Sequence, residues 1–283
     1  MKLPVLIGKA AELGEKADPF SVWCLPFTHN MLSHIVEWTN CKIREMQSKY
    51  QLQSTSQKET DVVELKTFFG LLIFTSVFNS NHENIETLFA TDGSGREIFR
   101  AVMSAKRFPI LLSALRFDNR VDREERRKVD PTAPISFNFK SFFENCQNVY
   151  GVGQSATIDE VLVSFRGRCR FKMYMQMKPC KYGIKIKALT DARNSYLFNA
   201  YKDSGKNSDG IGLIDEYKRF SKPTQTVLRL AEPLFGSNLN ITVDNWLSSI
   251  ELVNILSKNK LTYVGTLKKK QERNSSTIFA KKN

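Results

Sequence analysis

The chain has 283 residues, 41% of them hydrophobic, which is enough for one large or two modest domains with a sizeable core. Its 42 Lys and Arg residues against 29 Asp and Glu give a formal net charge of +13. Such an excess favours a polyanionic partner, with nucleic acid ahead of an acidic membrane surface. The five cysteines form no C-x-x-C pair, and the three histidines lie far from most of them. Neither a structural zinc site nor a disulfide framework is predicted.

Membrane association and secretion are not predicted. The longest apolar run, residues 67–77, is shorter than the roughly 18 residues that span a bilayer. The apolar stretch at the N-terminus is too short for a secretory signal. We therefore expect an intracellular, soluble protein with free thiols.

The first half of the chain has mainly helical periodicity. Residues 1–17 lack it and are expected to form a loose leader before a helical region over residues 18–150. The mixed-charge run at residues 120–130 is expected to be a solvated loop. Helices are predicted from Thr28 onwards, over residues 61–78, 85–89, 95–103 and 139–150, and in a segment that has Pro109 in its first turn.

The pattern becomes strand-like after Gly151. Residues 212–220 and 248–258 suit helices, and residues 226–231 fit no single class. Strands are predicted over residues 157–165, 168–175, 182–189, 196–200, 239–243 and 261–267. A run of antiparallel-looking strands followed by alternating strands and helices predicts an α/β fold with a mixed sheet.

Two aspartates occupy similar positions relative to these strands. Asp159 lies inside an apolar strand, and Asp244 directly follows the strand that ends at Val243. A carboxylate at the carboxyl end of a strand sits where open α/β sheets bind ligands. If the two strands are neighbours, both aspartates are candidate catalytic residues that bind Mg²⁺ or Mn²⁺ for phosphoryl transfer. Alternatively, Asp244 caps the following helix, and Asp159 pairs with Arg166 or Arg168.

A cationic segment follows Asp159, with no acidic residue between positions 166 and 187. Its first four cations alternate along the chain, so on a strand they would share one face. Such a face favours contact with DNA or RNA, whereas a solvated edge strand guarded by lysines is the alternative. The basic residues at 268–273 and 281–282 fit a solvated tail or a nuclear-import patch. The candidate nucleic-acid-binding residues are Arg166, Arg168, Arg170, Lys172, Lys178, Lys181, Lys185 and Lys187.

Several motifs together resemble piggyBac-type transposases and the proteins derived from them. They occur in the family's order and cover roughly residues 18–267. The motifs are Thr157–Glu160 with Phe165–Cys169, Lys178–Pro179 with Lys181–Lys185, Val243–Trp246 with Ser248–Ile250, Leu261–Leu267, Met103–Phe108 and Leu115–Asn119.

The resemblance implies a helical dimerisation and DNA-binding region followed, over residues 151–267, by a ribonuclease-H-like core. In the family this core carries three aspartates that bind two Mg²⁺ ions for cut-and-paste DNA transposition, typically at TTAA targets. Asp159 and Asp244 match the first two. The chain has no aspartate after Asp244, and Glu251 is expected to be a solvated helix position. The family's cysteine-rich zinc module is absent too, so we expect an incomplete core, with residues 268–283 forming a basic tail at the start of a truncated insertion.

Three functions follow as hypotheses. The first is a nuclear, transposase-derived DNA-binding protein that is inactive alone because the third metal-binding aspartate is missing. Under this hypothesis it binds transposon-end-like or non-specific DNA and can form a homodimer. The second is an active transposase fragment completed by a longer chain or a partner. The third is a degenerate relic with only an interaction role. Salt-dependent DNA affinity separates the first two from the third, and metal-dependent cleavage separates the second from the first.

Overall fold

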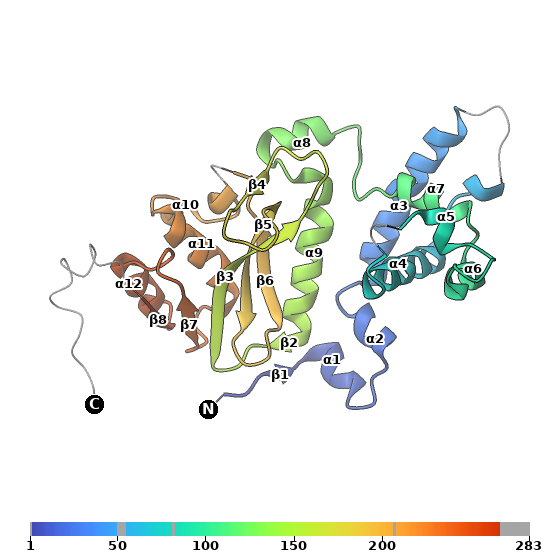
Figure 1. Ribbon diagram of the computed structural model, residues 1–283. Helices are drawn as coiled ribbons and strands as arrows, with labels where there is room; N and C mark the ends of the chain where they lie inside the picture. Colours follow the sequence, from blue (N-terminus) through green and yellow to red (C-terminus); the bar gives the residue numbers. More distant parts are fainter. Residues whose placement is uncertain (1, 50–54, 81–82, 206–207, 267–283) are drawn as a thin grey trace. The chain divides into compact units, whose positions relative to one another are not determined.

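The computed structural model describes residues 2–49, 55–80, 83–205 and 208–266 (Figure 1). The chain divides into two compact units. The helical unit comprises residues 27–141, and the sheet unit comprises residues 1–26 with residues 142–283. No helix in these described ranges is long and apolar enough to cross a membrane.

The helical unit is organised around an aromatic core. Phe68, Phe99 and Phe108 are fully buried, and Phe89 packs edge-on against Phe99 with ring centroids 5.5 Å apart. Helix α4 begins where the Asp61 carboxylate accepts a hydrogen bond from the Glu64 backbone N–H at 2.8 Å, which satisfies an otherwise orphaned donor. The elements are α3 (His29–Gln47), η1 (Thr55–Gln57), α4 (Val62–Val77), α5 (Ile85–Leu88), α6 (Glu97–Val102), α7 (Arg107–Ala114), α8 (Arg123–Val129) and the first part of α9 (Ala133–Val149).

The expected loop over residues 120–130 is wrong, because α8 occupies most of it. The mixed charges that suggested solvation lie three residues apart along a helix, and they pair as Glu124 with Arg127 at 2.9 Å and Glu125 with Lys128 at 2.7 Å. Helix α9 also begins earlier than the predicted residue 139, with Pro134 in its first turn. The predicted first-turn position of Pro109 in α7 is confirmed.

The sheet unit contains a mixed sheet in the order β4-β5-β3-β7-β8, with β6 also paired to β5. Strand β3 pairs antiparallel with β5 and parallel with β7, and β7 pairs parallel with β8. A buried cluster that includes Ile158, Val227 and Leu252 joins the sheet to α11 and α12. The elements are β1 (Val5–Leu6), α1 (Gly8–Leu13), α2 (Pro19–Cys24), β2 (Tyr150–Gly151), β3 (Ser155–Ser164), β4 (Lys172–Tyr174), β5 (Tyr182–Asp191), β6 (Leu197–Lys202), η3 (Ser208–Gly210), α10 (Asp215–Lys218), α11 (Lys222–Ala231), η4 (Glu232–Leu234), β7 (Asn240–Val243), α12 (Ile250–Lys258) and β8 (Thr262–Gly265).

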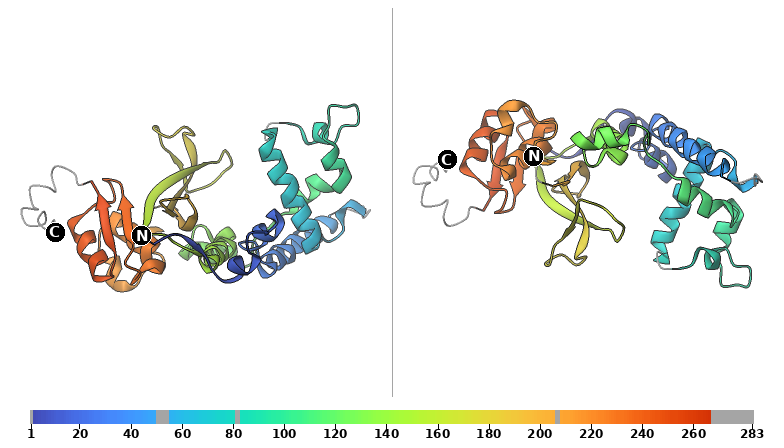
Figure 2. Two further views of the ribbon diagram at one scale, coloured as in Figure 1. Left: turned by 90° about the horizontal axis from the view of Figure 1, so that it is seen from below. Right: turned by 90° about the horizontal axis from the view of Figure 1, so that it is seen from above.

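Half of β3 extends beyond its parallel neighbour. Strand β7 pairs with residues 155–158 of β3 only, whereas β5 pairs with β3 as far as Ser164. In both views of Figure 2 the yellow-green end of β3, with β4 and β5, extends away from the orange and red β7, β8 and α12 of the same unit. We name residues 160–186 the hairpin arm. Asp159 therefore lies at the base of this arm.

The N-terminal residues differ from the expected loose leader. Strand β1 pairs antiparallel with β2, through Val5 with Gly151 and Leu6 with Tyr150, and α1 follows with Ala10 buried. The pairing joins segments about 145 residues apart, so local periodicity could not reveal it. The division into units also differs from the expected boundaries at residues 18 and 150. The predicted basic tail at 268–283 lies outside the described residues.

Candidate metal and nucleic-acid site

The two candidate aspartates are brought together by parallel strand pairing. Ile158 of β3 lies opposite Val243 of β7, and Asp159 and Asp244 directly follow these two residues in the chain. Because neighbouring parallel strands run level with one another, the two aspartates occupy adjacent positions at the carboxyl end of β7. Both aspartates are exposed. The condition that these two strands be neighbours is met.

Asp244 has a second role in the turn that follows β7. Its Oδ1 accepts hydrogen bonds from the backbone N–H groups of Trp246 and Leu247, both at 3.1 Å. The cap of α12 itself is Ser249, whose Oγ accepts from Leu252 N–H at 3.1 Å. Asp244 therefore does not cap the helix. It accepts the hydrogen bonds of a tight turn that precedes the helix, and this turn fixes the direction of the carboxylate.

Asp159 does not pair with an arginine. Its Oδ1 accepts a hydrogen bond from the adjacent Glu160 backbone N–H at 2.7 Å. In the described part of the chain, Asp159 forms no ion pair with Arg166 or Arg168, although all three residues are placed. The carboxylate is thus not neutralised by the arm.

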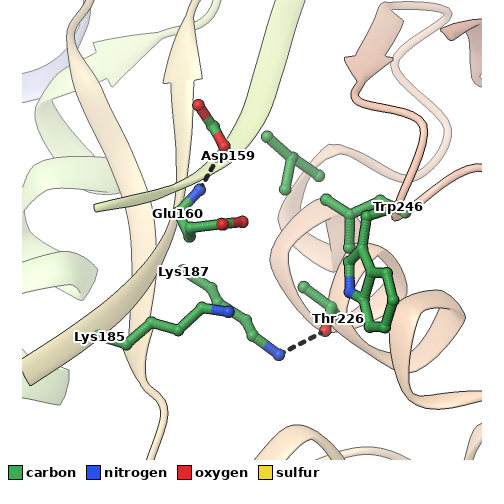
Figure 3. A pocket seen from close by; sticks show the side chains of 8 residues that line it. Asp159, Glu160, Lys185, Lys187, Thr226 and Trp246 are labelled. Carbon is green, nitrogen blue, oxygen red and sulfur yellow. Dashed lines mark hydrogen bonds between the residues drawn. The ribbon is translucent and has the colours of Figure 1, made fainter. Parts of the chain in front are cut away.

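A small hollow lies beside Asp159 (Figure 3). In the close-up, Asp159 and Glu160 come from β3, Lys185 and Lys187 from β5, and Trp246 faces them from the turn after β7. The Asp159 carboxylate is free of ion pairs among the described residues. Its lining is Ile158, Asp159, Glu160, Lys185, Lys187, Thr226, Trp246 and Leu247.

Lys187 was predicted to bind nucleic acid, but its ammonium group is paired inside the fold. Its side chain is only 12% exposed, and Nζ lies 2.5 Å from Asp209 Oδ1 and 3.0 Å from Thr226 Oγ1. The Tyr201 hydroxyl donates to the same Asp209 oxygen at 2.6 Å. Burial, reinforced by the negative charge of Asp209, raises the pKa of the Tyr201 phenol. Lys187 belongs to a buried polar network between β5 and α11.

The remaining predicted cations belong to the hairpin arm, but not on one strand face. Arg166, Arg168 and Arg170 are exposed in the connection between β3 and β4, and of the four alternating cations only Lys172 lies on a strand. The prediction of a strand over residues 168–175 is therefore wrong for its first half. The chain turns there, with Lys172 N–H donating to the Cys169 carbonyl at 3.3 Å and Lys172 Nζ donating to the Gly167 carbonyl at 3.2 Å.

The second arm connection, between β4 and β5, carries Lys178 and Lys181. Lys178 Nζ donates to the Glu160 carbonyl at 3.1 Å, so this loop folds back to the residue next to Asp159. Tyr174 and Tyr182 are exposed on neighbouring strands with ring centroids 4.9 Å apart. The arm therefore combines clustered cations with exposed aromatic rings, which is the surface chemistry that nucleic-acid-binding proteins use.

The comparisons with known proteins decide the family. The family model described as Transposase IS4 matches residues 18–283. A solved piggyBac transposase synaptic complex with hairpin DNA is similar to this chain, at 32% sequence identity and a TM-score of 0.83. The chain belongs to the piggyBac-type transposase family. The alignment covers 99% of this chain and 57% of the solved one, so the chain spans 57% of that relative's length.

The family likeness also confirms the predicted fold, a mixed α/β, ribonuclease-H-like sheet with flanking helices. Transposases of this type generally use a divalent metal ion. Asp159 and Asp244 fit one such ion, because Mg²⁺ is commonly held by one or two carboxylates together with waters and substrate phosphates. Within the described residues there is no group of three His, Cys, Asp or Glu side chains that could hold a metal ion.

Three side chains at this hollow were not predicted to be site residues. Glu160, Thr226 and Trp246 line the hollow beside Asp159. Trp246 follows Asp244 by two residues and is exposed, an unusual position for a large aromatic ring. The position of Trp246, two residues after Asp244, was the sequence signal that could have identified it as a site residue. Thr226 lies on α11, and the sequence of this part of α11 predicted no single type of secondary structure.

Proposed function

We propose that the chain is a DNA-binding protein of the piggyBac transposase family that does not cleave DNA by itself. The single observation that carries the proposal is the position of the hairpin arm. Its exposed arginines lie on the arm whose base holds the Asp159 and Asp244 carboxylates. DNA held along the arm would run past the two carboxylates.

The arm suits the DNA backbone more than the bases. Arg166, Arg168 and Arg170 are exposed in an irregular loop, so their guanidinium groups can adjust to phosphate positions. Each phosphate contact releases condensed counterions, and the affinity therefore falls steeply with salt. Tyr174 and Tyr182 add flat apolar surface on which an unpaired base can stack. The DNA bound is non-specific or similar to transposon ends.

Catalysis is proposed to be absent because the carboxylate set is incomplete. Two-metal phosphoryl transfer requires ligands that hold separate ions at the attacking and leaving oxygens. Asp159 and Asp244 supply carboxylates for one Mg²⁺ or Mn²⁺ ion, and the chain contains no aspartate after Asp244. A partner or a longer chain that supplied a third carboxylate would restore the reaction. We further propose that the protein acts in the nucleus as a homodimer.

DNA affinity as a function of salt tests the binding proposal. We expect a variant with Arg166, Arg168 and Arg170 changed to alanine to bind DNA more weakly, with a log–log salt slope smaller by about 3 than that of the unmodified chain. The matched control changes Arg127, Lys218 and Arg219 to alanine. These three exposed cations lie outside the arm, and their loss lowers the net charge equally. Equal losses in the two variants would overturn the role of the arm.

Cleavage is tested separately. Purified protein is incubated with transposon-end DNA and Mg²⁺ or Mn²⁺, and strand breaks are separated on a denaturing gel. We expect intact DNA. Cleavage that disappears in Asp159→Ala would overturn the proposed inactivity while leaving DNA binding in place.

A further inference from the structure

The helical unit contains an open cavity of about 610 Å³ that is separate from the site described above. One wall is a single face of α3, formed by Trp38, Cys41, Lys42 and Glu45 at spacings of three and four residues. The opposite wall is the segment 116–121, which follows α7. A cavity of this volume is in the range that holds small ligands.

Positive charge exceeds negative charge around Glu45, a residue that lines the cavity. Glu45 Oε1 lies 2.9 Å from Lys42 Nζ, 3.4 Å from Lys49 Nζ and 3.6 Å from Arg120 Nη1. These three cations share one carboxylate. Correspondingly, the pKa of Glu45 is lowered, mainly by its hydrogen bond with Lys42.

Arg116 adds a cation whose nearest bonds are to carbonyls. Its Nη1 donates to the carbonyl of Leu115 at 2.8 Å and to that of Ser113 at 3.4 Å. Among described residues it forms no salt bridge, because the neighbouring Asp118 is held by Arg123 and Arg126 at 2.5 and 2.7 Å. Burial and the adjacent arginines lower the pKa of Arg116. An anion in the cavity would relieve this repulsion.

The lining of the cavity also includes an aromatic side chain, Trp38. The Trp38 indole Nε1–H donates to His34 Nε2 at 3.0 Å, which fixes the orientation of the ring. A fixed indole offers a stacking surface at little entropic cost. Stacking on an aromatic ring is a common way to hold a nucleobase, and it contributes about 1–3 kcal/mol.

We propose that this cavity binds one nucleotide, with its phosphate at Arg116 and Arg120 and its base against Trp38. Arginine matches a phosphate with two parallel hydrogen bonds, and the cavity is large enough for base, sugar and phosphate together. The nucleotide is either free or an unpaired unit of a DNA strand. The site lies in the helical unit, so it is independent of the DNA contact proposed for the hairpin arm.

Cys41 provides the readout, because it lines the cavity and is exposed. The full chain is treated with a thiol alkylating reagent, and modification of each cysteine is followed by mass spectrometry. At a dAMP concentration of ten times Kd, we expect Cys41 to react about tenfold more slowly. Cys24, in α2 and outside both the cavity and the hairpin arm, is the internal control and should react at an unchanged rate. Deoxyadenosine, which lacks the phosphate, should protect Cys41 far less than dAMP does.

Variants and a second ligand complete the test. Arg120→Gln should raise the Kd for dAMP by about tenfold, whereas Arg127→Gln on the surface of α8 should leave it unchanged. Protection by dAMP shows that a free nucleotide suffices, and protection by a single-stranded tetranucleotide alone assigns the site to a base within a strand. Unchanged Cys41 reactivity with both ligands would overturn the proposal, as would equal protection by deoxyadenosine.

Discussion

Asp159 and Asp244 lie level on adjacent parallel strands, one residue beyond the register pair of Ile158 and Val243. The two carboxylates come from positions 85 residues apart in the chain. They differ in local support, because Asp244 is fixed by two backbone N–H groups and Asp159 by one. Each carboxylate retains an oxygen that can bind a cation.

The first prediction concerns this pair. Changing Asp159→Asn or Asp244→Asn should each lower Mn²⁺ affinity by at least about tenfold, because a charged oxygen ligand is lost. The Asp244→Asn amide oxygen can still accept the turn hydrogen bonds, so the fold should persist. Binding is followed by electron paramagnetic resonance of free Mn²⁺. Glu251→Gln, an exposed position in the first turn of α12, is the control, and a similar loss there would show a general charge effect instead.

Both aspartates stood out in the sequence because each one interrupts or ends an apolar run, and the pairing of β3 with β7 places them on neighbouring strands. The basic segment was harder to predict. Alternation of Arg166, Arg168 and Arg170 suggested a strand, but the chain turns between Cys169 and Lys172. Alternation describes a strand face only where a partner strand supplies hydrogen bonds, and β4 pairs with β5 over three residues.

Burial was the second limit on prediction. Lys187 follows Lys185 in the sequence and resembles it, yet its partner Asp209 is 22 residues away on a 3-10 turn. No local pattern links the two. A lysine in a strand is normally exposed, so the pairing of Lys187 with a carboxylate inside the fold depends on tertiary packing.

The second prediction follows from this network. Changing Lys187→Met should destabilise the sheet unit by about 3–5 kcal/mol, because Asp209 keeps a buried charge without its cation. Lys185→Met, two residues earlier, is the control and should cost much less. Unfolding in urea measures the difference. At temperatures where both variants are folded, DNA affinity of Lys187→Met should match that of the unmodified chain, and a large loss would restore Lys187 as a DNA contact.

The third prediction concerns the buried ion pair in the helical unit. Arg107 is only 5% exposed, and its Nε and Nη2 bind the two Glu64 oxygens at 2.8 and 2.6 Å. It also donates to the carbonyls of Ser56 and Lys58. Arg107→Met should destabilise the unit by about 3–5 kcal/mol, because Glu64 and these carbonyls lose their partner. Hydrogen exchange of α3 and α4 measures this loss of stability, and Arg127→Met serves as the exposed control.

Glu64 also gives this pair a dependence on pH. Burial alone would raise the pKa of its carboxyl, but the hydrogen bonds from Arg107 and Thr60 outweigh burial and lower the pKa. The stabilisation is complete above the ordinary value of 4.5 and is lost as the pH falls through the lower folded-state pKa. Glu64→Gln should remove this part of the acid sensitivity. An unchanged acid transition would contradict the assignment.

The last prediction concerns His34. Burial lowers the pKa of its imidazole, with Arg126 acting in the same direction and Glu37 and Asp118 opposing it. Its Nε2 accepts the Trp38 indole N–H, so protonation would place a second donor against that group. Nδ1 is buried and has no hydrogen-bond partner among the described residues. The neutral ring is therefore the form that fits the fold.

Because the folded-state pKa lies below the ordinary 6.5, the unfolded chain binds a proton first as the pH falls. The stabilisation from neutral His34 is complete above about pH 6.5 and decreases as the pH falls through the folded-state pKa. Hydrogen exchange of α3 should accelerate between about pH 7 and pH 5 after correction for the intrinsic rate. His34→Phe keeps the ring contact with Phe137, which has a centroid distance of 4.1 Å, but cannot titrate. Its exchange should lose this pH dependence, and the same acceleration in the variant would place the titrating group elsewhere.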